Sequence, residues 1–117
     1  MLPHSQRLAR SEDVRAVLRR GRRRAGDLVV VHVRERDDEL TGRATAVASR
    51  KVGNAVERNR AKRVLRAAIA EVGVTTGCDV ALVARRATTA AGTQQVVAEL
   101  RALFDGTVGA ERRVVAS

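Results

Sequence analysis

Apolar and polar residues follow strand-like spacing in three parts of the chain. Residues 28–33 form a β-branched run, and residues 43–49 alternate so that neighbouring side chains point to opposite faces. An acidic turn at residues 37–39 lies between these runs, so we expect the two strands to pair as a hairpin. Residues 79–84 predict a third, buried strand.

Helical spacing marks three other segments. Ser11 predicts the start of the first helix, with a capping hydroxyl followed by Glu12 and Asp13 near the positive end of the helix dipole. Gly21 is a typical helix stop. Residues 94–104 predict a closing helix with one apolar face.

The most informative helix begins near residue 54 and ends before Gly73. Asn54 and Glu57 are three residues apart, which predicts a capping box. An apolar stripe at helical spacing predicts the buried face, made of Ala61, Leu65, Ala68, Ile69 and Val72. At about 100° per residue, the polar and basic side chains on the opposite side are Asn59, Lys62, Arg63 and Arg66, with Arg60 at its edge.

The chain has 117 residues, of which 44% are hydrophobic, and this predicts one globular domain with a modest core. We expect that domain to cover residues 1–117, with frayed ends at about residues 1–6 and 107–117. Phe104 is the only aromatic residue, so the core is predicted to be aliphatic.

The net charge of the chain limits the classes of partner that it is expected to bind. Lys and Arg number 23 against 13 acidic residues, a net charge of +10, which predicts a polyanionic partner such as nucleic acid or an anionic membrane surface. No stretch approaches the roughly 18 consecutive apolar residues that cross a bilayer, so we expect no membrane insertion. The single cysteine excludes an internal disulfide and is typical of a reducing compartment, so we expect the protein in the cytoplasm.

Most of this charge lies around the long helix. Residues 50–66 hold seven basic residues and one acid, Glu57. Exposed helix faces usually mix signs, and like charges at helical spacing cost a few tenths of a kcal/mol per pair. A nearly all-positive face therefore predicts nucleic-acid binding. A secondary basic patch follows the first helix; it is an ordinary solvated surface or a phosphate contact, and it consists of Arg19, Arg20, Arg22, Arg23 and Arg24.

Residues 49–63, SRKVGNAVERNRAKR, resemble the signature of the bacterial ribonuclease P protein family, in which a strand end leads into an Arg-Asn-Arg helix. The resemblance extends over about residues 7–104. It implies an α+β fold, a two-layer α/β sandwich in the order α-β(3)-α-β-α, with a left-handed β-α-β crossover against the usual preference. It also implies removal of the 5′ leader from precursor tRNA, with the RNA subunit and its magnesium ions performing the hydrolysis. The protein itself would supply no catalytic side chain and no metal ligand.

The resemblance also implies positions for two RNAs. Contacts to the catalytic RNA would come from Arg50, Lys51, Asn54, Arg58, Asn59, Arg60, Lys62, Arg63 and Arg66. The leader would lie in a cleft between the first helix and the sheet, lined by Val14, Leu18, His32, Val47 and Ser49. The family commonly has phenylalanine at positions 14 and 18 and an aromatic residue at position 32, so this cleft departs from the pattern. The implied partners are the catalytic RNA and precursor tRNA, with neither DNA nor membrane, and a monomer in the absence of RNA.

Two other functions also account for the charge: a structural ribosomal protein, or a DNA-binding module with a basic helix in the major groove. No second helix is predicted a short turn before residue 54, which disfavours the DNA-binding interpretation. Single residues have more ordinary interpretations as well. His32 is more often structural on a strand than a ligand to RNA, residues 37–39 are more often an acidic turn than a magnesium site, and Cys78 is more often a small buried residue than a nucleophile.

Overall fold

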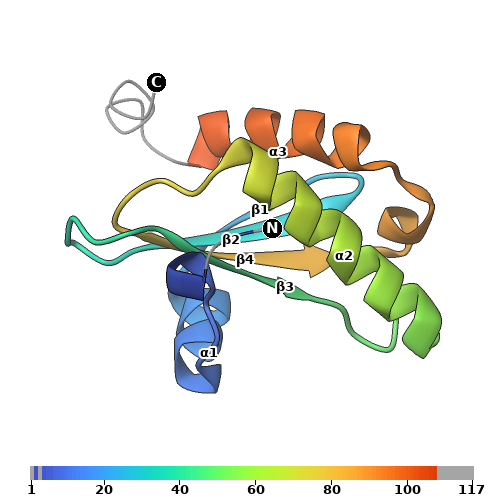
Figure 1. The fold of residues 1–117 in the computed structure, drawn as a ribbon, viewed down its shortest axis with the longest axis horizontal. Coiled ribbons are helices and arrows are strands. Elements are labelled where there is room, and N and C mark those ends of the chain that lie inside the picture. Colours follow the sequence, from blue (N-terminus) through green and yellow to red (C-terminus); the bar gives the residue numbers. More distant parts are fainter. Residues whose placement is uncertain (1, 3, 108–117) are drawn as a thin grey trace.

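The computed structural model describes residue 2 and residues 4–107, and Figure 1 shows their arrangement. Over this range the chain forms a four-stranded sheet, three α-helices and two short 3-10 helices. In chain order the elements are η1 (His4–Gln6), α1 (Ser11–Arg20), β1 (Arg22–Ala25), β2 (Val29–Glu35), β3 (Arg43–Val47), α2 (Ala55–Val72), β4 (Cys78–Ala84), η2 (Arg86–Ala90) and α3 (Thr93–Thr107). This is the mixed α+β order implied by the resemblance. Of the predicted frayed ends at about residues 1–6 and 107–117, His4–Gln6 form η1 and Thr107 ends α3, whereas residues 108–117 lie outside the described residues.

The sheet has the strand order β1-β2-β4-β3. β2 pairs antiparallel with both β1 and β4, whereas β3 pairs parallel with β4. The helix α2 is therefore the crossover that connects two adjacent parallel strands. α2 and α3 lie together on one face of the sheet, and α1 lies on the other (Figure 1). None of the helices in the described range is long and apolar enough to cross a membrane.

The predicted hairpin between β2 and β3 is wrong, because β4 lies between these two strands. All but one residue of β4 is buried, and a strand buried on both faces belongs in the middle of a sheet. β2 instead forms its hairpin with β1, a strand that the sequence analysis took only as a basic patch. Its sequence, Arg-Arg-Arg-Ala, carries no apolar alternation that would have indicated a strand.

The main core lies between the sheet and the helices α2 and α3. The predicted stripe of α2 is confirmed, since Ala61, Leu65, Ala68 and Ile69 are buried in that core. The capping box is confirmed as well. Asn54 Oδ1 accepts a hydrogen bond from the Glu57 amide and Glu57 Oε1 accepts one from the Asn54 amide, each at 2.9 Å. Cys78 is buried in the same core, as expected for a small apolar residue.

The ends of α1 differ from the prediction. Ser11 is the first helical residue, and the preceding Arg10 caps the helix without a side-chain hydrogen bond. Gly21 ends α1 in an extended conformation rather than a left-handed one. A residue with a side chain would not fit at position 21, because its Cβ would lie 2.5 Å from the carbonyl oxygen of Val17.

A buried ion-pair network connects three parts of the sheet. Asp79 of β4 is fully buried, and its carboxylate accepts hydrogen bonds from Arg43 at 2.9 and 3.0 Å. This bidentate pairing raises the pKa of Arg43 above its ordinary value. Arg36, at the end of β2, also pairs with Asp79 and donates to the carbonyl oxygens of Leu40 and Thr41. The connection between β2 and β3 is thereby held to the middle strand.

The acidic turn at residues 37–39 is part of this network. Asp38 forms an ion pair with Arg36 at 3.2 Å, and the hydrogen bond from Arg36 is the main cause that lowers the pKa of Asp38. Arg43 also reaches Asp13 of α1, with 3.5 Å between Nη1 and Oδ2. Asp13 therefore anchors the first turn of α1 to the start of β3, a contact that sequence spacing did not indicate.

Replacing Asp79 with alanine should lower the free energy of unfolding by about 3–5 kcal/mol, because two arginines would lose their buried counter-charge. Urea unfolding followed by circular dichroism measures this change. Asp38→Ala is the matched control, since Asp38 contacts Arg36 at the surface and its removal should cost less. An equal loss in both variants would contradict the central role of Asp79.

Candidate nucleic-acid interface

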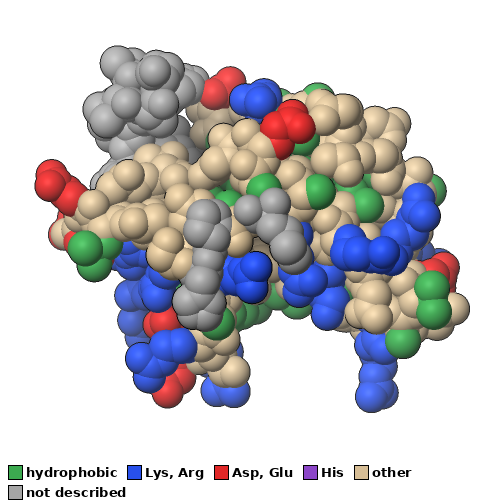
Figure 2. Space-filling view, in the orientation of Figure 1, with side chains coloured by type: hydrophobic (Ala, Val, Ile, Leu, Met, Phe, Trp, Pro, Cys, Tyr) green, Lys and Arg blue, Asp and Glu red, His purple; other side chains and the backbone are tan. Residues whose placement is uncertain are grey.

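The outward face of α2 is basic and unpaired. Asn59, Arg63 and Arg66 are exposed, as their spacing opposite the buried stripe predicts, and Arg58 and Lys62 flank them in a half-buried position. Within the described range no ion pair connects the basic side chains of α2 to an acid. In Figure 2, Lys and Arg side chains gather on the side of the molecule that carries α1 and the first turns of α2. This face is therefore free to bind an anion.

Asn54 and Arg60 also have structural roles. The Asn54 side-chain oxygen is engaged in the helix cap. Arg60 Nε donates to the carbonyl oxygen of Thr89 at 2.8 Å and so holds η2 against α2. Among the predicted RNA contacts, these two residues also support the local fold.

A second cluster of basic residues lies where the strands end. Arg86 Nε donates to the carbonyl oxygen of Lys51 at 3.1 Å, so the segment after β4 lies beside the segment after β3. Arg85 reaches the other way, to the carbonyl oxygen of Gly26 at 3.2 Å. The sequence analysis did not single out Arg85 and Arg86, which are exposed directly after the buried strand β4.

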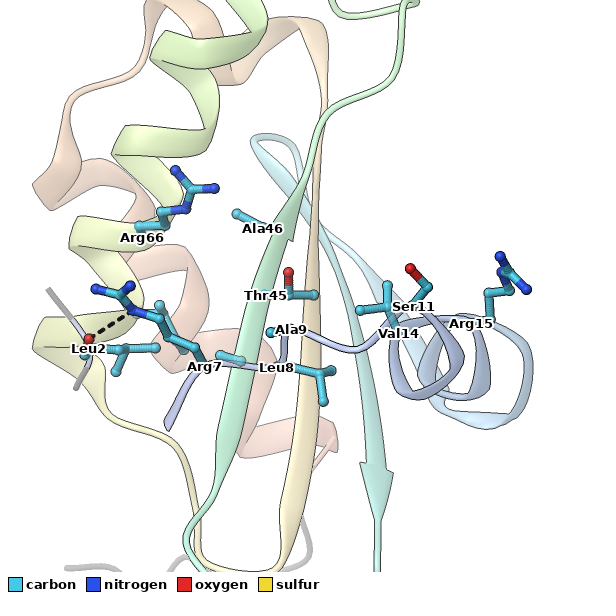
Figure 3. Close-up of a pocket in the computed structure, with 12 residues that line it drawn as sticks. Leu2, Arg7, Leu8, Ala9, Ser11, Val14, Arg15, Thr45, Ala46 and Arg66 are labelled. Carbon is cyan, nitrogen blue, oxygen red and sulfur yellow. Dashed lines mark hydrogen bonds between the residues drawn. The ribbon is translucent and has the colours of Figure 1, made fainter. Parts of the chain in front are cut away.

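A groove of about 620 Å³ lies along β3, the edge strand; we call it the edge groove (Figure 3). β3 forms its floor, α1 one wall and α2 the other. One end is closed by the N-terminal segment, where the Leu8 amide donates to the carbonyl oxygen of Ala44 at 2.9 Å. The lining residues are Leu2, Arg7, Leu8, Ala9, Ser11, Val14, Arg15, Ala44, Thr45, Ala46, Arg66 and Ile69.

The chemistry of the edge groove favours binding over catalysis. Its charged side chains are Arg7, Arg15 and Arg66, whose guanidinium groups donate hydrogen bonds and have no acceptor atom. Guanidinium groups around an apolar floor suit a phosphate chain with bases or sugars packed below it. The sequence analysis did not identify Arg7 and Arg15, because their position depends on the pairing of the N-terminal segment with β3.

The predicted cleft residues share the α1 face of the sheet. In the strand register Val47 pairs with Val83, and His32 pairs with Ala81, so these side chains point to the same side. Val14 and Leu18 of α1 are half-buried and pack against a small second core, formed by Leu8, Val17 and Ala81. Ser49 is exposed beyond the end of β3, where its Oγ accepts a hydrogen bond from the Lys51 amide at 3.3 Å.

His32 has an unusual environment on the α1 face of the sheet. Its Nδ1 is buried, and among the described residues no hydrogen-bond partner reaches it. Burial lowers the pKa of His32 below its ordinary value of 6.5, and the charge of Arg23 lowers it further. The imidazole is therefore neutral at pH 7, and it lies on the α1 face of the sheet outside the residues that line the edge groove.

The fold and this cationic surface define a small α+β protein of the nucleic-acid-binding class, with a basic crossover helix beside an apolar, arginine-lined groove. The chain belongs to the ribonuclease P protein family, whose sequence profile, described as Ribonuclease P, matches residues 2–108. Members of this family are protein components of ribonuclease P, an endoribonuclease complex, and this implies an RNA partner. Family membership sets aside the ribosomal and DNA-binding alternatives.

Relatives and solved structures agree with this assignment. The ribonuclease P protein component of Acidothermus cellulolyticus is 43% identical over 110 residues, covering 93% of this chain and 90% of that one. That of Dehalococcoides mccartyi is 42% identical over 84 residues, covering 72% and 69%. The fold is similar to the RNase P protein from Thermotoga maritima, with a TM-score of 0.72, 24% identity and coverage of 88% and 98%. A mutant RNase P protein of Staphylococcus aureus gives a TM-score of 0.71 at 25% identity, covering 85% of each chain.

The lowered pKa of His32 predicts a pH dependence of stability. The unfolded chain binds a proton near pH 6.5, whereas the folded protein resists it, so stability should fall as the pH decreases through 6.5 toward the folded pKa. Thermal unfolding between pH 7.5 and pH 5 measures this change. In His32→Gln the loss over that window should be smaller. A pH profile identical to that of the unmodified protein would show that His32 titrates normally.

Proposed function

We propose that this chain is the RNA-binding protein subunit of ribonuclease P, in which it binds the catalytic RNA and the 5′ leader of precursor tRNA. The complex would remove the leader by hydrolysis and leave the mature 5′ end of the tRNA. The catalytic RNA would bind to the basic face of α2, and the leader would lie along α1. The protein would bind and position RNA, and the RNA subunit would carry the chemistry.

The observation that carries this proposal is the unpaired positive face of α2. Arg63 and Arg66 are exposed at the centre of that face, and no acid of the described chain neutralises them. A bound polyanion would offset the electrostatic repulsion between these arginines. Arg66 also lines the edge groove, so the surface proposed for the catalytic RNA adjoins this groove.

The leader is expected to bind by its backbone more than by its bases. Val14 and Leu18 offer aliphatic contact, and His32 is the one flat side chain among the predicted cleft residues. Aromatic stacking is worth about 1–3 kcal/mol per base, and the two aliphatic positions forgo it. Phosphate contacts carry little sequence information. We therefore propose a weak dependence on leader sequence and a strong dependence on leader length and salt.

Magnesium fits the RNA subunit better than the protein groove. The charged side chains of the edge groove are arginines, which repel a divalent cation, whereas magnesium is held by carboxylate, carbonyl and phosphate oxygens. The metal ions of this reaction would therefore be held by RNA phosphates, and the arginines would compensate part of the remaining phosphate charge.

Reconstitution tests the proposed function directly. The protein combined with the catalytic RNA of a ribonuclease P should support magnesium-dependent removal of the leader at physiological salt. The protein alone, free of RNA, should not cleave precursor tRNA. Cleavage by the RNA-free protein, or the absence of any stimulation of the catalytic RNA, would contradict this function.

The basic face of α2 is tested by Arg63→Gln combined with Arg66→Gln. Affinity for the catalytic RNA should fall, and the slope of log affinity against log salt should decrease by about 0.7–0.9 for each phosphate that the variant no longer neutralises. The measurement is filter binding at several salt concentrations, with melting curves to show that the variant is folded. Arg101→Gln, which removes one exposed positive charge from α3, is the control and should leave the slope unchanged. Equal slopes in all three proteins would exclude α2 as the RNA surface.

A further inference from the structure

A small notch lies at the outer edge of β2, next to the point where β1 begins. β1 starts with Arg22 opposite Val33, so the next two residues of β2, Arg34 and Glu35, pair with β4 but with no residue of β1. We call this place the β1 notch; its volume is about 240 Å³, and it is lined by Arg20, Arg22, Val33, Arg34 and Glu35. Pockets that hold a whole small molecule usually measure about 300–1,000 Å³, so the β1 notch suits a single charged group.

The β1 notch is separate from the edge groove. The strand order β1-β2-β4-β3 places β1 and β3 at opposite edges of the sheet, and the two sites share no lining residue. Neighbouring residues of β2 point to opposite faces, and Val33 and Arg34 both line the notch, so it opens at the edge of the sheet. Only the last residue of α1, Arg20, lines it. The notch therefore lies at the end of that helix and not between the helix and the sheet.

Three arginines from three elements meet at the β1 notch. Arg20 ends α1, Arg22 begins β1 and Arg34 is the last residue but one of β2. The first two are exposed, and Arg34 is half-buried. Within the part of the chain that the structure describes, no acid forms an ion pair with any of the three. Glu35 is the one carboxylate among the lining residues, so the local charge stays positive.

We propose that the β1 notch is a phosphate site. A guanidinium presents planar N–H donors that match the oxygens of a phosphate, and it keeps its charge. Three such groups around one pocket repel one another, and a bound phosphate would offset that repulsion. Because the family has an RNA partner, we expect the phosphate to come from an RNA backbone, at a place to which neither α2 nor the edge groove contributes a residue. The secondary basic patch is thereby divided: Arg20 and Arg22 line the site, and its other three arginines do not.

Two ordinary roles also fit these arginines. Basic residues in the last turn of a helix interact favourably with the negative end of its dipole, and this applies to Arg19 as well as to Arg20. Charged residues on an edge strand prevent pairing with other chains, and this applies to Arg23 as well as to Arg22. Both roles predict that the two members of each pair are interchangeable. A phosphate site predicts that only the members that line the notch affect binding.

The experiment compares two double variants that remove the same charge from the same arginine run. Arg20→Gln with Arg22→Gln is the notch variant, and Arg19→Gln with Arg23→Gln, which do not line the notch, is the control variant. Affinity for the catalytic RNA is measured at several salt concentrations, with melting curves to show that each variant is folded. The notch variant should bind several-fold more weakly than the unmodified protein, with a salt slope lower by about 0.7–0.9. The control variant should keep the slope of the unmodified protein.

Inorganic phosphate tests the site in the absence of RNA. In NMR spectra of the unmodified protein, the amide signals of residues 20–22 and 33–35 should shift saturably as phosphate is added at constant ionic strength. The notch variant should lose this response, and the control variant should keep it. Glu35→Gln should strengthen the response, because it removes a carboxylate that repels the anion. Asp27→Asn, which changes an exposed acid outside the notch, should leave it unchanged.

The other outcomes separate the possible errors. Phosphate shifts that do not saturate, or that remain in the notch variant, would overturn the site. Saturable shifts at these residues with an unchanged RNA slope would keep the site and reject RNA as the source of the phosphate. The basic face of α2 is tested by its own variant, so the notch can fail while the proposed function stands. If no form of the protein binds the catalytic RNA, the proposed function fails, and the phosphate titration still decides the site.

Discussion

The buried carboxylate of Asp79 is the constraint on which the rest of the structure depends. Two arginines from different strand ends converge on it, so it determines how β2, β3 and β4 align. Arg43 also forms an ion pair with Asp13, which connects α1 to the same cluster. The floor and one wall of the edge groove are therefore positioned by a single charge cluster. A buried carboxylate requires full pairing, because leaving it alone would cost several kcal/mol.

Several acidic side chains bind groups within the fold, so they do not neutralise the arginines at the surface, which can then bind an anion. Besides Asp13, Asp38 and Asp79, Glu99 of α3 accepts hydrogen bonds from the backbone amides of residues 27–29 at 2.8–2.9 Å and so holds the β1–β2 turn. A Cβ on Gly26 would lie 2.4 Å from that carboxylate, so a larger residue there would require the Glu99 side chain to move. These acids stabilise the fold instead of neutralising the outer face of α2. The net charge of +10 is thus concentrated where a polyanion can reach it.

The two faces of the sheet have separate roles. Alternate residues of β2 and β4, such as Val31 and Leu82, are buried under α2 and α3 in the main core. The residues between them face α1, which covers the sheet only with a small second core. One face thus provides most of the apolar burial that stabilises the protein, and the other contributes Thr45 to the edge groove. Because side chains alternate along each strand, the same strands build both surfaces without competing for space.

The sequence by itself determined the local features. The capping box at Asn54, the buried stripe of α2 and its basic face depend on contacts within about four residues, which helical periodicity encodes directly. The family signature lies in the same segment. Strand pairing, the burial of Asp79, and the meeting of Arg7 and Arg66 at the edge groove were decided only by the tertiary structure. These contacts connect residues tens of positions apart. Local spacing records which face of a strand is apolar, but the choice of neighbouring strand depends on how much of both faces must be buried, which is a property of the whole sheet.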